Sequence, residues 1–109
     1  MQNMGVYPAP HFWANLTFVE GKSRVIEPSG SGLPMWRSDF SYYDEPDVIY
    51  FIWPTGREPN GEVGLYCIPP ERWAEKHAAK ITVGLEFSLV EGRMLVARGV
   101  VTRVAAPEV

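Results

Sequence analysis

The sequence predicts an all-β protein: a small closed antiparallel β-barrel of about six strands, with one short helix near residues 70–79. Short segments of alternating, β-branched or aromatic residues recur along the chain, and turns rich in glycine and proline separate them. The 109 residues are enough for one domain with its own core. We therefore expect an extended lead-in at residues 1–10 and a single barrel domain at residues 11–109.

The predicted elements follow in order from residue 11. Alternation in residues 11–20 gives two faces: Phe12, Ala14, Leu16 and Phe18 on one, and Trp13, Asn15, Thr17 and Val19 on the other. The later elements are a short returning strand at 21–27, a loop at 28–34, strands at 35–43 and 47–53, a long turn at 54–61, a strand at 62–68 and a strand hairpin at 81–104.

The segment at 69–80, "PPERWAEKHAAK", interrupts the two-residue period. Pro70 suits the first position of a helix, and the acidic start and basic end complement the helix dipole. Trp73 and His77 are four positions apart, so a helix would place them on one face. These features predict the short helix.

Composition excludes several classes of function. The net charge of −3 and pI of about 5.3 disfavour a general nucleic-acid binder. Cys67 is alone, so no intramolecular disulfide forms, which fits a reducing compartment. The start of the chain lacks a signal-peptide pattern, and no apolar run is long enough to span a bilayer. We expect a soluble, cytoplasmic protein with no membrane partner and no cofactor.

The stretch "GLEFSLVEGRMLVARGVVTRV" at residues 84–104 is the most distinctive part of the chain. It resembles the end of the C-terminal β-barrel domain of elongation factor Tu, which carries "GLRF…EGG…VGAGVVT". The matching residues are Gly84, Leu85, Phe87, Glu91, Gly92, Val96, Gly99, Val100, Val101 and Thr102. Upstream, "ANLTFVEGKSR" resembles the first strand of that domain and the turn after it, so the similarity spans residues 12–104.

The resemblance implies a free-standing barrel of the elongation factor Tu type. In that family the barrel works beside a GTPase domain and contacts aminoacyl-tRNA and the nucleotide exchange factor. This chain departs from the pattern: Arg93 replaces a turn glycine, and Leu33 and Met35 stand where a loop carries arginine and glutamine. It also has no GxxxxGK[ST] phosphate loop, so no GTP binding of that kind is expected.

Few residues suggest catalysis or metal binding. Cys67 and His77 could form a thiol–imidazole pair, but a buried structural cysteine is the simpler interpretation. With His11 they could ligate a metal only if the fold gathers them, because no metal-ligand spacing links them. We predict no enzyme activity and no metal site.

A surface that binds another protein is the more specific hypothesis for the function of this chain. The chain is rich in tryptophan and tyrosine, and an aromatic patch outside the barrel would need a partner or a second copy to cover it. Tryptophan and arginine are common in binding hot spots. The candidate partner-binding residues are Pro34, Met35, Trp36, Arg37, Arg93, Arg98 and Arg103. Scattered surface arginines are the alternative interpretation.

Three functions remain open at this point. The first is a non-enzymatic module that binds a protein partner or itself, either with translation components or by mimicking the elongation factor. The second is a tRNA- or RNA-binding module, which the net charge disfavours. The third is a small enzyme that uses Cys67 or His77.

The register of the last hairpin decides where Arg98 points. With a turn at Gly92-Arg93, as in the family, Leu89 pairs with Val96 and Phe87 with Arg98, so Arg98 shares the core face. A three-residue loop at 90–92 would instead turn Arg98 outward, because a one-residue change flips the strand face. We expect the family register, with Arg98 near the barrel end and a carboxylate within reach.

Overall fold

The computed structural model describes residues 9–23, 26, 28, 38–42, 49–68, 71 and 73–105. Within these residues the elements are β1 (Phe12–Phe18), β2 (Ser38–Tyr42), β3 (Ile49–Arg57), β4 (Val63–Ile68), the π-helix η1 (Trp73–His77), β5 (Glu86–Glu91) and β6 (Met94–Val104). No helix in the described part of the chain has the length and apolar character that a membrane crossing requires.

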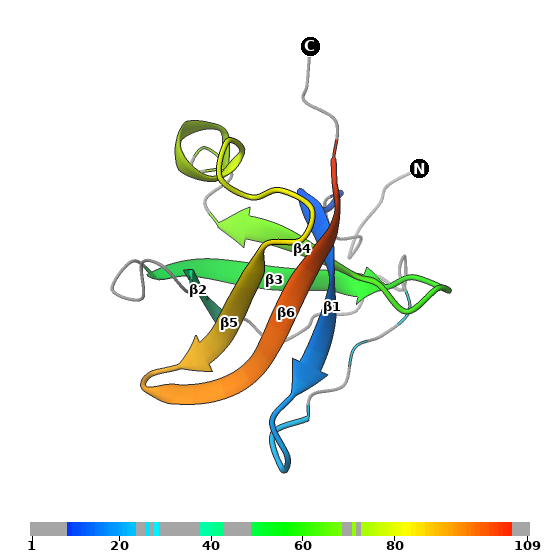
Figure 1. The fold of residues 1–109 in the computed structure, drawn as a ribbon, viewed down its shortest axis with the longest axis vertical. Helices are drawn as coiled ribbons and strands as arrows, with labels where there is room; N and C mark the ends of the chain where they lie inside the picture. The colour runs from blue at the N-terminus through cyan, green and yellow to red at the C-terminus, as the bar shows by residue number, and fades with distance from the viewer. Residues whose placement is uncertain are drawn as a thin grey trace, which may run out of the picture.

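The six described strands form one antiparallel sheet that curls strongly (Figure 1). Hydrogen bonds link them in the order β1–β4–β3–β2–β5–β6, and β6 also pairs with β1. Short turns join β3 to β4 and β5 to β6. β1 lies between β4 and β6, and both of these strands are far from β1 in the sequence. The prediction of an all-β fold with about six antiparallel strands is confirmed.

The predicted strand positions agree with β1, β2 and β4, but β3 is longer than expected. It continues to Arg57, so the predicted long turn at 54–61 is wrong in its first half. A bulge between Pro54 and Gly56 accommodates the proline within the strand. The actual turn is closed by the Glu58 amide, which donates to the Glu62 carbonyl oxygen at 2.7 Å.

Parts of the predicted early segments lie outside the described residues. Of the expected strand at 21–27, residues 21–23 and 26 are described, and none of them belongs to a strand. Pro28 forms an isolated parallel bridge with Arg57. The predicted helix near 70–79 is present as a π-helix of five residues, in which the Ala78 amide donates to the Trp73 carbonyl oxygen at 2.7 Å.

Three phenylalanine rings from different strands form the centre of the core. Phe12, Phe40 and Phe87 are at most 1% exposed. The Phe40 and Phe87 rings stack with centroids 4.6 Å apart, and Phe12 meets each of them edge to face at 6.1 and 6.0 Å. These are the preferred geometries of aromatic pairs, so the rings tie β1, β2 and β5 together across the sheet.

The π-helix covers one end of this core and is visible in Figure 1 as the coiled segment beyond the tip of β4. The Trp73 ring stacks on Phe12 at 5.9 Å, and the buried His77 ring meets Phe40 edge to face at 6.4 Å. Ile81, four positions after the end of the helix, is 1% exposed. The predicted shared face of Trp73 and His77 is therefore the face that packs onto the core.

The turn of the last hairpin is Gly92-Arg93, as the resemblance implies, but the predicted pairing beyond it is wrong. Glu91 pairs with Met94, and Gly92 has a φ of 64°, as the first position of a type II′ turn requires. A bulge then makes Val96 an extra residue, since Val90 pairs with Leu95 and Leu89 with Ala97. Both Val96 and Ala97 are fully buried.

The bulge changes the position of Arg98. It pairs with Ser88 on β5 and Thr17 on β1, and its side chain is exposed on the outer face. The expectation that Arg98 shares the core face with Phe87 is contradicted. The residue opposite Phe87 is Gly99, which leaves room for the ring.

Replacing Gly99 by alanine should destabilise the fold by about 1–3 kcal/mol, because the new methyl group would overlap the Phe87 ring. Urea unfolding measures this change. The double variant Gly99→Ala/Phe87→Leu should lose less than the sum of the two single losses, because the smaller side chain frees the space. Additive losses would show that Gly99 and Phe87 do not share this constraint.

Candidate functional site

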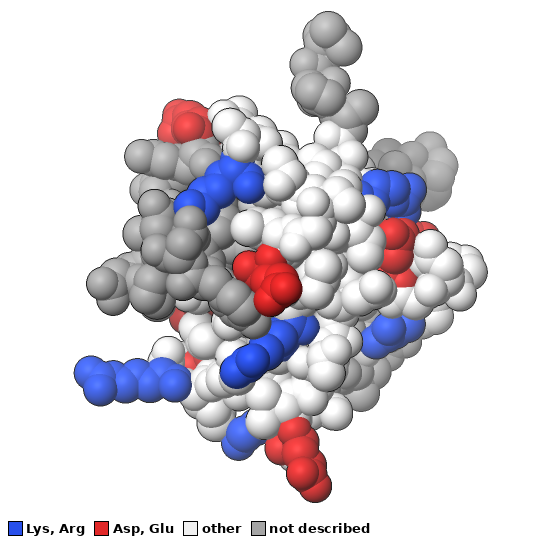
Figure 2. Space-filling view, in the orientation of Figure 1, with Lys and Arg blue, Asp and Glu red and all other residues white. Residues whose placement is uncertain are grey.

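The outward face of β1, β5 and β6 presents a mixed surface that we call the β6 face, defined by Trp13, Asn15, Thr17, Glu86, Ser88, Arg98, Val100 and Arg103. The strand pairings order these side chains in rows: Val100 lies between Asn15 and Glu86, and Arg98 lies between Thr17 and Ser88. Figure 2 shows acidic and basic groups interspersed with uncharged surface on this side of the molecule, including the part over β5 and β6.

Val100 is the apolar centre of the β6 face. Its exposed fraction is 43%, which is high for a large aliphatic side chain in the middle of a strand. Its neighbours in the sequence, Gly99 and Val101, are buried, so the alternation of the strand directs Val100 outward. The face therefore combines an apolar residue with the adjacent guanidinium of Arg98.

Arg103 and Trp13 form a stacked pair at one end of the face. They are paired across β6 and β1, and the guanidinium carbon of Arg103 lies 3.8 Å from the centroid of the Trp13 ring. This is the geometry of a cation–π interaction. Arg103 Nη2 also donates to Glu62 Oε1 at 3.1 Å, and Trp13 Nε1 donates to Glu58 Oε2 at 3.1 Å.

Glu62 links the β3–β4 turn to this pair. Its Oε2 accepts a 2.7 Å hydrogen bond from Thr102 Oγ1, and its Oε1 accepts from Asn60 Nδ2 at 3.2 Å. These hydrogen bonds lower the pKa of the Glu62 carboxyl group below its ordinary value, and the bond from Thr102 has the largest effect. The carboxylate is therefore ionised at neutral pH and has several donors besides Arg103.

The structure brings two of the predicted partner-binding residues, Arg98 and Arg103, onto one face. Arg93 is exposed in the β5–β6 turn, at the end of the same hairpin. The other predicted residues lie outside the described part of the chain: Pro34, Met35, Trp36 and Arg37.

Comparison with known proteins gives no further guide to this surface. No protein-family model, curated protein or solved structure matches this chain. The likeness to the elongation factor Tu barrel stays a prediction that depends on the residues of the last hairpin.

Cys67 is in an environment that disfavours a nucleophilic thiolate. The residue is 3% exposed, and burial raises the pKa of its thiol to about 12. A thiolate would thus be scarce at neutral pH. Among the described residues, no group of three or more His, Cys, Asp or Glu side chains is arranged to hold a metal ion.

His11 is held as a neutral ring between two aromatic side chains. Its ring stacks with Tyr66 at 4.7 Å and with Trp73 at 4.8 Å. Nδ1 accepts a 3.0 Å hydrogen bond from the Cys67 amide, so the other nitrogen, Nε2, carries the proton of the neutral ring. Burial lowers the pKa of His11, which favours this neutral form.

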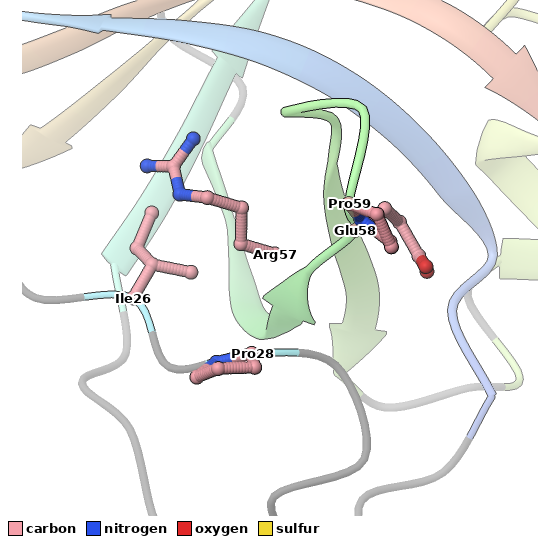
Figure 3. Close-up of a pocket in the computed structure, with 5 residues that line it drawn as sticks. All are labelled: Ile26, Pro28, Arg57, Glu58 and Pro59. Atoms are coloured by element: carbon pink, nitrogen blue, oxygen red, sulfur yellow. The ribbon is translucent and has the colours of Figure 1, made fainter.

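A shallow pocket of about 430 Å³ lies beside the β3–β4 turn (Figure 3) and is lined by Ile26, Pro28, Arg57, Glu58 and Pro59. Figure 3 shows the Arg57 side chain over Ile26 and Pro28, whereas the Glu58 carboxylate points away from them. Arg57 Nη1 donates to the Gly61 carbonyl oxygen at 3.1 Å. The lining residues do not direct a set of polar groups at a common point, so we do not assign the pocket a ligand.

Sequence reasoning placed Trp13 on the strand face opposite Phe12 but did not identify it, or Glu62, as part of the site. The missing information is the pairing of β1 with β6, which brings residue 13 beside residue 103. The sequence carries one weak signal, a tryptophan at an outward position next to the core residue Phe12. Tryptophan at an exposed strand position needs a packing partner.

The His11 environment predicts acid-sensitive stability. Because its pKa is below the ordinary 6.5 in the folded protein, the unfolded chain binds the proton at higher pH. The free energy of unfolding should be constant between about pH 7 and 8 and should fall as the pH decreases below 6.5. Urea unfolding between pH 7.5 and 5.5 measures this fall, at pH values above the range in which Glu62 titrates.

His11→Asn is the matched variant, because its amide oxygen can accept the Cys67 N–H bond and does not titrate. The variant should show a smaller loss of stability between pH 7.5 and 5.5 than the parent chain. An equal loss in both proteins would mean that another group causes the acid dependence.

The burial of Cys67 predicts that its thiol reacts only when the protein opens. Labelling with 5,5′-dithiobis(2-nitrobenzoate) at pH 8 should be slow in native buffer and should reach one equivalent quickly in 6–8 M urea, about the concentration that unfolds small domains. Fast stoichiometric labelling without denaturant would contradict the described position of Cys67.

Proposed function

We propose that this chain is a non-enzymatic binding module that acts through a protein–protein surface on the β6 face. The observation that carries the proposal is the exposed Val100 beside Arg98 on β6, on the same face as the stacked Trp13–Arg103 pair. Tryptophan and arginine around an apolar centre are typical of binding hot spots. Acidic and basic groups are interspersed on the side of the molecule shown in Figure 2, and this mixture favours a protein partner over a nucleic acid.

The scaffold in this proposal is a closed barrel of the elongation factor Tu C-terminal type. The pairing of β6 with β1, together with the family-like turn at Gly92-Arg93, supports it. The resemblance suggests a translation component as partner, or mimicry of the elongation factor to occupy one of its partners. A free, buried Cys67 fits a cytoplasmic setting.

An RNA-binding module is the second candidate, because Arg93, Arg98 and Arg103 all lie on the β5–β6 hairpin. Binding of this kind would weaken steeply as salt increases. The negative net charge and the pairing of Arg103 with Glu62 argue against it.

Affinity capture with two matched aspartate variants tests the proposal. Val100→Asp puts a charge at the centre of the β6 face and should reduce capture of a specific partner, or self-association, by tenfold or more. Val83→Asp is the control, since Val83 is a 68% exposed valine in the turn before β5. It should retain binding.

Purified elongation factor Tu, its exchange factor and tRNA are the first molecules to test, and sedimentation tests self-association. Equal binding by the parent chain, Val100→Asp and Val83→Asp would exclude the β6 face as the interface. Binding to tRNA that disappears between 50 and 200 mM salt, roughly the range over which phosphate contacts weaken, would favour the RNA candidate instead.

A further inference from the structure

Arg103 is held in place from two directions, unlike an ordinary surface arginine. The Trp13 ring supports one face of its guanidinium at 3.8 Å, and Glu62 Oε1 binds Nη2 at 3.1 Å. Both supports are fixed in turn, Trp13 by Glu58 and Glu62 by Thr102. The guanidinium has therefore already lost much of the freedom that a binding arginine must give up.

The guanidinium still has donors available. Its five N–H groups form a planar fork, and Glu62 occupies the Nη2 end. The Arg103 side chain is 51% exposed, whereas that of Glu62 is 14% exposed. The exposed N–H groups of the guanidinium can therefore donate hydrogen bonds to a second carboxylate without displacing Glu62.

Glu62 does not depend on Arg103 alone. Thr102 and Asn60 also donate to its two oxygens, and the Asn60 side chain accepts a 3.0 Å hydrogen bond from the Glu62 amide. Because the negative charge is shared among three donors, Arg103 can interact with another anion at moderate cost. Without the Thr102 and Asn60 donors, Glu62 would depend on Arg103 alone and would compete with the incoming anion for its guanidinium.

The surroundings favour a carboxylate on a protein over a phosphate chain. Glu58 and Glu62 lie close to Arg103, and Glu86 lies beside Val100, so a continuous phosphate backbone would meet repulsion along the face. A single carboxylate side chain at Arg103 meets less of this repulsion, because it carries one charge and need not follow the face. The exposed Val100, three positions before Arg103 on β6, offers an apolar contact to a neighbouring side chain of the same partner.

We propose that Arg103, stacked on Trp13 and braced by Glu62, receives a carboxylate side chain from an acidic and apolar segment of a protein partner. This inference rests on the proposed function of the β6 face and adds the chemistry of the partner. Trp13 and Glu62 act as positioning residues, since they orient the guanidinium.

Nuclear magnetic resonance titration of the whole chain tests the inference. The probes are a capped peptide with one glutamate flanked by leucines, its counterpart with glutamine in place of the glutamate, and inorganic phosphate. The acidic peptide should shift the Arg103 Nε–H and Trp13 indole N–H signals, and the glutamine peptide should not. Arg103→Gln should weaken binding of the acidic peptide about tenfold or more, as expected for loss of a charge-assisted pair.

Two variants keep the result interpretable. Lys22→Gln removes a positive charge from the turn after β1, outside the β6 face, and should leave peptide binding unchanged. Glu62→Gln keeps the Arg103 charge, so it should bind the acidic peptide clearly more tightly than Arg103→Gln does. Unchanged cross-strand amide signals of β1 and β6 show that each variant is folded.

The outcomes separate this inference from the proposed function. Equal shifts with both peptides, or unchanged binding in Arg103→Gln, overturn the carboxylate site. Tighter binding of phosphate than of the acidic peptide overturns the assignment to a protein carboxylate. If Val100→Asp abolishes capture of a partner but Arg103→Gln does not, the β6 face is the interface and the carboxylate site is wrong.

Discussion

The packing of Phe12, Phe40 and Phe87 is the constraint on which the rest of the structure depends. Each ring comes from a different strand, and the stacked and edge-to-face contacts fix how β1, β2 and β5 approach one another. Gly99 provides the space that Phe87 needs on β6. The π-helix packs onto two of the same rings, through Trp73 on Phe12 and His77 on Phe40. The three phenylalanines therefore both hold the strands together and bind the helix that covers one end of the core.

The outer face follows from this inner packing. Phe87 opposite Gly99 fixes the register of β5 and β6, and this register places Arg98 and Val100 outside. Phe12 directed inward likewise turns Trp13 outward, where it meets Arg103. Core and surface are therefore coupled residue by residue, because neighbouring side chains in a strand point to opposite sides.

Much of the fold was predictable because its signals are local. The alternation around Phe12 and Ala14 and the turn at Gly92-Arg93 can be recognised without knowledge of the partner strands. The bulge at Val96 cannot, since valine and alanine fit either face of a strand, and in the structure both Val96 and Ala97 are buried. The Trp13–Arg103 pair was equally inaccessible, because it depends on contact between the two ends of the described chain.

β6 contains two irregular positions, and such positions change which side chains of the strand point outward. Val96 is an extra residue against β5, and Thr102 is an extra residue against β1, where Trp13 pairs with Arg103 and Ala14 with Val101. Residues five positions apart lie on opposite sides of a regular strand. Arg98 and Arg103 both point outward because the second irregularity shifts the alternation by one. A chain of the same composition with a regular β6 could display one of these arginines, but not both.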